Sequence, residues 1–192
     1  MVELKKENIS EIVNLIKQGK IVALPTDTIY GFSCLATSNK AVKKLCELKR
    51  CADDKLFILL VSKNYDLNNL AVLNEQTKKF ISKNTPNPVT MILQKNKNLK
   101  LAKNFYSPTI AVRVPDNEFL QQILEHVGFM ISTSCNVHGQ ANLTNFKDIK
   151  NTFSSLDAIV ECNNVNYNSS STIVDLTTLD HKILRQGNYV VK

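Results

Sequence analysis

The sequence predicts a mixed α/β fold, of the α+β kind, in which helices flank a twisted and largely open β-sheet. Short apolar runs bounded by polar residues, such as Leu56–Val61, are typical of buried strands. Other segments, such as residues 8–19, carry apolar residues at helical spacing. The two kinds of segment alternate without a strict βαβ rhythm, so the sheet should combine parallel and antiparallel strands.

The first element is an amphipathic helix over residues 8–19. Its apolar side chains recur at helical spacing, and Asn8 and Glu11 are placed as a capping box at its start. Gly19 stands where a glycine commonly ends a helix. This helix should lead directly into the first strand of the sheet.

That strand, Ile21–Leu24, opens the stretch IVALPTDTIYG, which we interpret as a binding lip. Pro25 has no N–H to donate to a neighbouring strand, so the strand should stop there. Polar and aromatic side chains, Thr26–Tyr30, then follow at its carboxyl end, where open α/β sheets bind their ligands. On these residues alone, a strand followed by a simple turn is an equal alternative.

The remaining elements follow from the same patterns. Gly128 stands at the expected C-cap of a helix, and residues 86–88 form a proline-rich turn. The last segment, residues 183–191, contains a turn at 185–187. Helices are expected at residues 41–50, 75–84, 119–127 and 146–153, and further strands at 56–61, 89–93, 110–114, 129–131, 158–160 and 172–176.

Length and composition limit the class of protein that can contain this lip. With 192 residues, of which 43% are hydrophobic, and no linker-like stretch, we expect a single domain over residues 1–192. No apolar run approaches the roughly 20 residues of a membrane span, and the N-terminus lacks the apolar core of a signal peptide. We therefore expect a cytoplasmic protein that does not contact a membrane.

The five cysteines are scattered, with no C-x-x-C pair and no histidine at metal-ligand spacing, so we expect free thiols and no metal ligands from the protein. The net charge of +7 favours anionic ligands such as nucleotides or RNA, although solubility alone explains equally basic proteins. The sequence contains no Walker loop, no G-x-G-x-x-G, no G-x-S-x-G and no obvious Ser/His/Asp set.

Polar residues gather instead at the ends of expected strands. Hydroxyl and amide groups concentrated in this way, with cations near them, suit recognition of a zwitterion or a phosphate chain. The clusters are residues 26–30, Thr109 with Arg113, residues 132–136 and residues 170–172, and the candidate cations are Lys49, Arg50, Lys55, Arg113 and Arg185.

Seven motifs occur in an order that resembles the YrdC-like family, the threonylcarbamoyl-AMP synthases of tRNA modification. Any one of them would be weak, but seven in order are highly specific. The resemblance extends from about Gly19 to Gly187 and implies a YrdC-like fold. The motifs are PTDTIYG, a helix ending in ELK, PNPVT, IAVRVP, STSCN, SSTIVDL and LRQG.

The resemblance implies a nucleotidyltransferase that makes threonylcarbamoyl-adenylate from L-threonine, bicarbonate and ATP, and releases pyrophosphate. A partner transferase would then pass the threonylcarbamoyl group to adenosine 37 of tRNA, and Mg²⁺ would accompany the ATP. By similarity, L-threonine would contact Thr28, Arg113, Ser132 and Ser171; ATP would contact Lys49, Lys55, Thr109, Ser134, Asn142 and Arg185; and Lys49, Arg50, Ser134 and Asn136 would form the catalytic set.

Two departures from the family pattern keep alternatives open. Cys51 stands where the family has an arginine, and Asn87 stands where it has a glycine. We favour a local shift that lets Arg50 take the place of the missing arginine. The first alternative is an RNA-binding or regulatory protein of the YciO type without synthase activity, and the second is a carbamoyl-transfer domain of the kind found in hydrogenase-maturation proteins.

Overall fold

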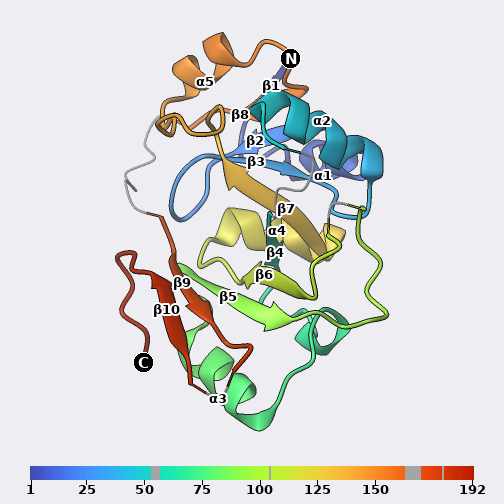
Figure 1. Cartoon of the computed structure of the whole chain (residues 1–192). Helices are drawn as coiled ribbons and strands as arrows, with labels where there is room; N and C mark the ends of the chain where they lie inside the picture. The colour runs from blue at the N-terminus through green and yellow to red at the C-terminus, as the bar shows by residue number, and fades with distance from the viewer. Residues whose placement is uncertain (53–56, 104, 163–169, 179) are drawn as a thin grey trace.

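The structure is a computed structural model, which describes residues 1–52, 57–103, 105–162, 170–178 and 180–192. One sheet of ten strands runs through this described part of the chain, in the order β1-β8-β2-β3-β7-β4-β6-β5-β9-β10 (Figure 1). Its strands are β1 Val2–Leu4, β2 Val22–Leu24, β3 Gly31–Cys34, β4 Ile58–Val61, β5 Val89–Gln94, β6 Thr109–Arg113, β7 Phe129–Ser134, β8 Ala158–Val160, β9 Thr172–Asp175 and β10 Lys182–Arg185.

The sheet is mixed, as predicted. Strands pair in parallel at β1–β8, β2–β8, β4–β6 and β5–β9, and the other neighbours pair antiparallel. Figure 1 shows helix α5 near the N-terminus of the chain and helix α3 at the opposite end, beside β9 and β10. The helices are α1 Ile9–Lys17, α2 Asn39–Lys49, α3 Glu75–Asn84, α4 Glu118–Val127 and α5 Phe146–Thr152, with a 3₁₀ turn at Leu67–Asn69.

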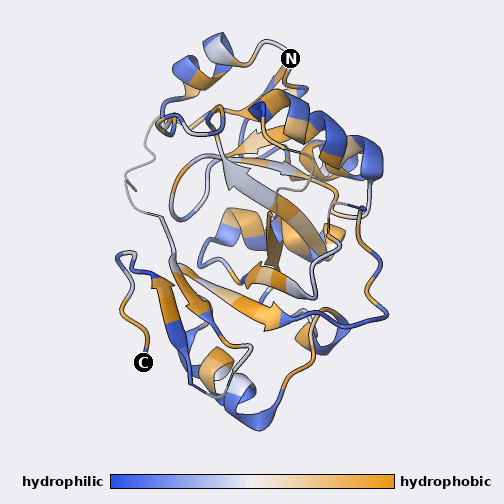
Figure 2. Cartoon of the chain, viewed as in Figure 1, coloured by the Kyte–Doolittle hydropathy of each residue, from blue (hydrophilic) through white to orange (hydrophobic). Residues whose placement is uncertain are grey.

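Alternation along the strands divides the core into two hydrophobic clusters, because successive side chains of a strand point to opposite faces. In β4, Leu60 belongs to the cluster that contains the apolar faces of α1 and α4. Its neighbours Leu59 and Val61 belong to the larger cluster, together with apolar residues of α2, α3 and α5. The strands in the middle of the sheet are accordingly hydrophobic along much of their length (Figure 2).

The beginning of β2 is tied to α2 by Asp157. Its Oδ2 atom accepts a hydrogen bond from the N–H of Ile21 at 2.9 Å and from Lys44 Nζ at 2.7 Å, and Lys20 Nζ lies 4.0 Å from Oδ1. Burial by itself would raise the pKa of Asp157, but these hydrogen bonds and charges outweigh it and hold the pKa below its usual value. The carboxylate form is therefore stabilised by folding.

Several sequence predictions need correction. The predicted capping box is wrong, because Asn8 Oδ1 accepts the N–H of Lys5 and caps no helical N–H of α1. Strands β1, β3 and β10 were not expected, and β7 continues through Ser134 rather than ending at residue 131. Leu56, the expected start of β4, lies outside the described residues. Among the described helices, none combines the length and the apolar character that crossing a membrane requires.

Candidate functional site

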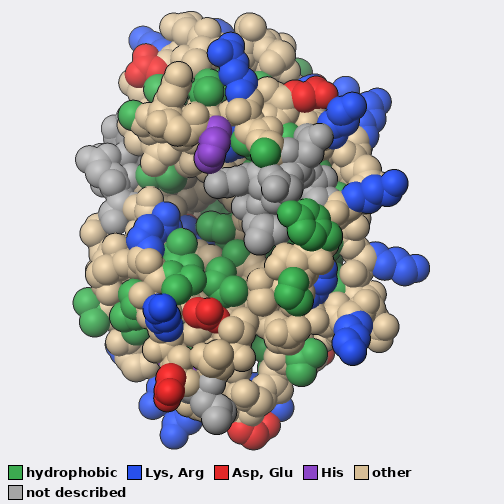
Figure 3. Space-filling model, viewed as in Figure 1, with side chains coloured by type: hydrophobic (Ala, Val, Ile, Leu, Met, Phe, Trp, Pro, Cys, Tyr) green, Lys and Arg blue, Asp and Glu red, His purple; other side chains and the backbone are tan. Residues whose placement is uncertain are grey.

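A cavity of about 460 Å³ opens on the face of the sheet, between the loop that follows β2 and the strands β4, β5, β6, β7 and β9. Figure 3 shows a hollow near the middle of this face, with hydrophobic side chains gathered beside it. The wall combines apolar side chains such as Phe57, Ile110 and Ile173 with many hydroxyl groups. This combination suits a ligand that is partly apolar and carries several hydrogen-bonding groups.

The lip, Thr26–Tyr30, is a turn built around one hydroxyl group. Thr26 Oγ1 accepts the N–H groups of Thr28 and Ile29 at 3.0 and 3.2 Å, and it donates to the carbonyl of Ile29 at 2.6 Å. Thr28 Oγ1 lies 3.1 Å from the same atom. The lip is therefore a defined turn that also lines the cavity, so both readings of this stretch were partly right.

Tyr30 differs from the rest of the lip. Its side chain is fully buried, and its hydroxyl donates to the carbonyl of Val160 at 2.8 Å. Burial strongly raises the pKa of this phenol, so the hydroxyl stays protonated at neutral pH. Tyr30 is one of the residues that line the cavity, and its ring packs in the core beneath the lip.

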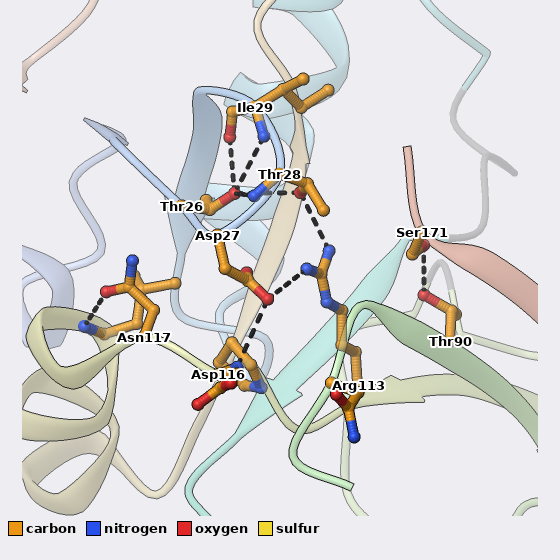
Figure 4. A network of polar contacts seen from close by, with 12 residues as sticks. Thr26, Asp27, Thr28, Ile29, Thr90, Arg113, Asp116, Asn117 and Ser171 are labelled. Atoms are coloured by element: carbon orange, nitrogen blue, oxygen red, sulfur yellow. Dashed lines mark hydrogen bonds and ion pairs between the residues drawn. The ribbon is translucent and has the colours of Figure 1, made fainter. Parts of the chain in front are cut away.

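A buried ion pair joins the lip to β6 (Figure 4). Arg113 Nη2 lies 2.6 Å from Asp27 Oδ2, and Arg113 Nη1 donates to Thr28 Oγ1 at 3.0 Å. The two charged side chains are only 6% and 9% exposed. Asp27 Oδ2 also accepts the N–H of Asp116 at 3.3 Å. A guanidinium group on an apolar strand is thus compensated by a carboxylate of the protein itself.

The ion pair leaves some of its hydrogen-bonding capacity unused. Within the part of the chain that the structure describes, Arg113 Nε and Asp27 Oδ1 are buried and have no hydrogen-bond partner. Such groups are costly in a folded protein unless a ligand or water satisfies them. Both residues line the cavity, so a polar ligand that enters it could supply the missing partners.

The opposite wall comes from β5, β9 and β10. Thr90 Oγ1 and Ser171 Oγ lie 2.8 Å apart, as Figure 4 shows. Arg185 donates from Nε and Nη2 to the carbonyl of Ser171, at 3.1 and 2.8 Å. Burial lowers the pKa of Arg185, and the positive charge of Arg113 lowers it further. Two guanidinium groups and one carboxylate therefore lie around one cavity.

Eight of the residues expected at the site line this cavity, and three of the described ones do not. Arg50 is exposed, and its left-handed backbone (φ 51°) ends α2. Lys49 is buried and contacts the turn that contains Asn136. Lys55 lies outside the described residues. The eight that line the cavity are Thr28, Thr109, Arg113, Ser132, Ser134, Asn142, Ser171 and Arg185.

The sequence patterns assigned no substrate contact to Asp27 or to Thr90, although both residues line the cavity. The sequence does contain an indication for Asp27, because it is the single carboxylate of the lip and a buried arginine needs an anion as its partner. Thr90 had a weaker one, since it is a polar residue within an otherwise apolar strand.

A cavity lined by hydroxyl groups, two guanidinium groups and a carboxylate defines a protein that binds a small polar anion or zwitterion. Comparison with known families gives the particular group. The family model of Sua5, YciO and YrdC proteins, described as "Telomere recombination", matches residues 14–187. The chain belongs to this family.

Individual relatives agree with that membership. The chain is 30% identical to a threonylcarbamoyl-AMP synthase of Histophilus somni, over 94% of this chain and the whole of that protein. Pyrococcus abyssi Sua5 in complex with L-threonine is 25% identical, with a TM-score of 0.87 over 97% of this chain and 57% of that chain. Escherichia coli YciO is also 25% identical, with a TM-score of 0.85 over the whole chain and 96% of that protein.

Proposed function

We propose that this protein is a nucleotidyltransferase that synthesises threonylcarbamoyl-AMP from L-threonine, bicarbonate and ATP, with release of pyrophosphate. The observation that carries the proposal is the cavity in which Arg113, Thr28, Ser132 and Ser171 meet. Threonylcarbamoyl-AMP synthases among its relatives, and a related structure that holds L-threonine, supply the identity of the reaction.

Threonine would bind at the end of the cavity where Arg113 lies. Its carboxylate would accept from the unused N–H of Arg113 and from the hydroxyl groups of Ser132 and Ser171. Thr28 would hold the guanidinium group in place through its 3.0 Å hydrogen bond. Arginine and hydroxyl groups would donate hydrogen bonds to the substrate carboxylate in this arrangement. The ion pair between Arg113 and Asp27 would not have to change its conformation.

ATP would occupy the remaining part of the cavity, near Arg185, Thr109, Ser134 and Asn142. Apolar side chains such as Phe105 offer a surface for the adenine ring. The amino group of threonine and bicarbonate would condense to a carbamate with loss of water, and an oxygen of this carbamate would attack the α-phosphorus. The new oxygen–phosphorus bond forms while the bond to the β-phosphate oxygen breaks, and pyrophosphate carries away the charge. Positioning and fixed positive charge are what such a reaction requires.

Mg²⁺ would enter as a complex with ATP and would neutralise part of the phosphate charge. Asp27 is the single carboxylate among the described residues of the cavity wall, and it is paired with Arg113. No described group of three or more His, Cys, Asp or Glu residues could hold a metal ion. These residues fit a metal held by the triphosphate rather than by a protein cage.

This synthesis would be the first step of N6-threonylcarbamoyladenosine formation at position 37 of tRNA, in the cytoplasm, and a downstream threonylcarbamoyl transferase would use the product. We further propose that residues 1–192 act as one YrdC-like domain. The continuous sheet from β1 to β10 supports this proposal. The net charge of +7 would favour contact with tRNA without requiring it.

The deciding experiment is incubation with ATP, L-threonine and bicarbonate, followed by measurement of pyrophosphate and of the product mass. Pyrophosphate release should need threonine and bicarbonate together, and serine should be the nearest competitor because losing one methyl group changes binding by only about 1–3 kcal/mol. Ser132→Ala should reduce the rate, whereas the exposed Ser154→Ala, as a matched control, should not. Equal activity with glycine would show that the threonine pocket is assigned wrongly.

A YciO-like protein without synthase activity is the second candidate. Two observations favour it: the full-length similarity to YciO, and the absence of Arg50 and Cys51 from the cavity wall. It predicts binding of ATP or RNA without pyrophosphate release under any combination of the three substrates.

A further inference from the structure

Lys49, the last residue of α2, directs its ammonium group into the turn after β7. Its Nζ atom lies 2.5 Å from the carbonyl oxygen of Ser134 and 2.9 Å from both the carbonyl oxygen and Oδ1 of Asn136. The N–H of His138 in turn donates to the carbonyl of Lys49 at 2.8 Å. Hydrogen bonds therefore run from the end of α2 to the turn and from the segment after the turn back to the end of α2.

An ammonium group has three donors and no acceptor, and these three oxygens are enough to accept all three. The residue is only 2% exposed and does not line the cavity. To contact a phosphate, Lys49 would have to give up at least one of these partly buried oxygens, which is unfavourable because that oxygen would lose its donor. Direct phosphate binding is thus the less favourable use of this cation.

The contacts of Lys49 determine how Ser134 faces the cavity. Asn136 Nδ2 donates to the carbonyl of Gln140 at 2.7 Å, which orients the amide so that Oδ1 faces Lys49 and Ser134. Ser134 Oγ then donates to this Oδ1 at 2.6 Å. With its hydrogen directed toward Asn136, the hydroxyl of Ser134 offers lone pairs to the cavity that it lines. It can accept a hydrogen bond from a ligand hydroxyl or amine.

We propose that Lys49 is a positioning residue, which holds the turn Ser134–Asn136 and so presents Ser134 to the nucleotide, instead of contacting the phosphates itself. This inference rests on the proposed function, because it assumes that ATP occupies the cavity beside Ser134. It replaces the phosphate contact that the family resemblance implies for Lys49.

A double-mutant cycle tests the proposal. The affinity for ATP is measured calorimetrically for the wild type, Lys49→Met, Ser134→Ala and the double variant. If Lys49 acts through Ser134, the two single changes are not additive: Ser134→Ala weakens binding by about tenfold in the wild type and by less than about twofold in the Lys49→Met background. If the two effects multiply, Lys49 acts independently of Ser134 and the proposal is overturned.

Controls keep this result interpretable. Lys43→Met removes an exposed lysine from the same helix and should leave ATP affinity unchanged. If thermal unfolding shows that Lys49→Met does not fold, Asn136→Ala takes its place in the cycle, because it removes the side-chain amide whose Oδ1 atom links Lys49 to Ser134 and whose Nδ2 atom donates to Gln140. The same loss of the Ser134→Ala effect is then expected, and an unchanged effect overturns the proposal.

If the wild-type protein binds no ATP, the proposed function fails and the positioning role is decided in the ligand-free protein. The amide resonances of Ser134 and Asn136 should then move in the variant that folds, Lys49→Met or Asn136→Ala, and stay in place in Lys43→Met. Unmoved resonances in that variant would overturn the positioning role by themselves.

Discussion

Removal of the guanidinium group of Arg113 should damage both stability and threonine binding, and the ion pair with Asp27 allows the two effects to be separated. In Arg113→Ala the Asp27 carboxylate, which is 9% exposed in the wild type, loses the partner at 2.6 Å. Breaking one side of a buried pair typically costs 3–5 kcal/mol. Asp27 keeps the N–H of Asp116, so we expect about 3 kcal/mol, the lower end of that range.

The double variant Asp27→Asn/Arg113→Met isolates the binding effect. It removes both charges and keeps similar side-chain volumes, and replacing a buried pair by neutral groups is often close to neutral in stability. We expect its free energy of unfolding in urea to return to within about 1 kcal/mol of the wild type. Threonine affinity, measured by calorimetry, should stay at least about tenfold weaker in both variants, because no guanidinium group remains for the carboxylate.

Two results would refute this reasoning. Recovery of threonine affinity together with stability in the double variant would mean that Arg113 has a structural role only. An Arg113→Ala protein as stable as the wild type would mean that the ion pair contributes nothing, and that the burial of Asp27 is tolerated for another reason. ATP affinity serves as the internal control, since it should change little in either variant.

Three further predictions test other parts of the molecule. Asp157→Asn should lower the free energy of unfolding at pH 7, and the difference from wild type should shrink as the pH falls below about 4, because the folded-state pKa lies below the unfolded value. A thiol reagent should modify Cys51 and Cys162 quickly and the three buried cysteines only on unfolding. Gly187→Ala should lower both the melting temperature and pyrophosphate release, because an added Cβ would lie 2.3 Å from the carbonyl oxygen of Ser170, which belongs to the cavity wall.

Sequence patterns predicted well the elements that carry a local apolar signal and missed strands that lack one. Helix α3 and strand β8 have the expected bounds, because an amphipathic repeat or an apolar run flanked by polar residues is visible locally. Strands β1 and β3 have three and four residues and pair with distant segments. Neither VEL nor GFSC is a continuous apolar run flanked by polar residues, and the pairing partners of these strands cannot be inferred from the neighbouring sequence.

The residues of the site were likewise predicted only in part. Family motifs placed Thr28, Ser171 and six other residues at one cavity, and the structure brings these side chains together. The partner of Arg113 was not predicted, because Asp27 is brought to it only by the turn of the lip and the order of strands in the sheet. The buried position of Lys49 was hidden for a similar reason, since a basic residue at a helix end is usually exposed.

The charge around the cavity is consistent with the two different substrates that we propose for it. Asp27 compensates Arg113, so the end of the cavity that we propose for threonine is close to neutral before a ligand enters. A zwitterion can bind there by completing hydrogen bonds that the ion pair leaves unused, without bringing in net charge. The charge of Arg185 has no carboxylate at ion-pair distance among the described residues. It is therefore available to the nucleotide end, where Mg²⁺ that enters with ATP would supply the rest of the positive charge.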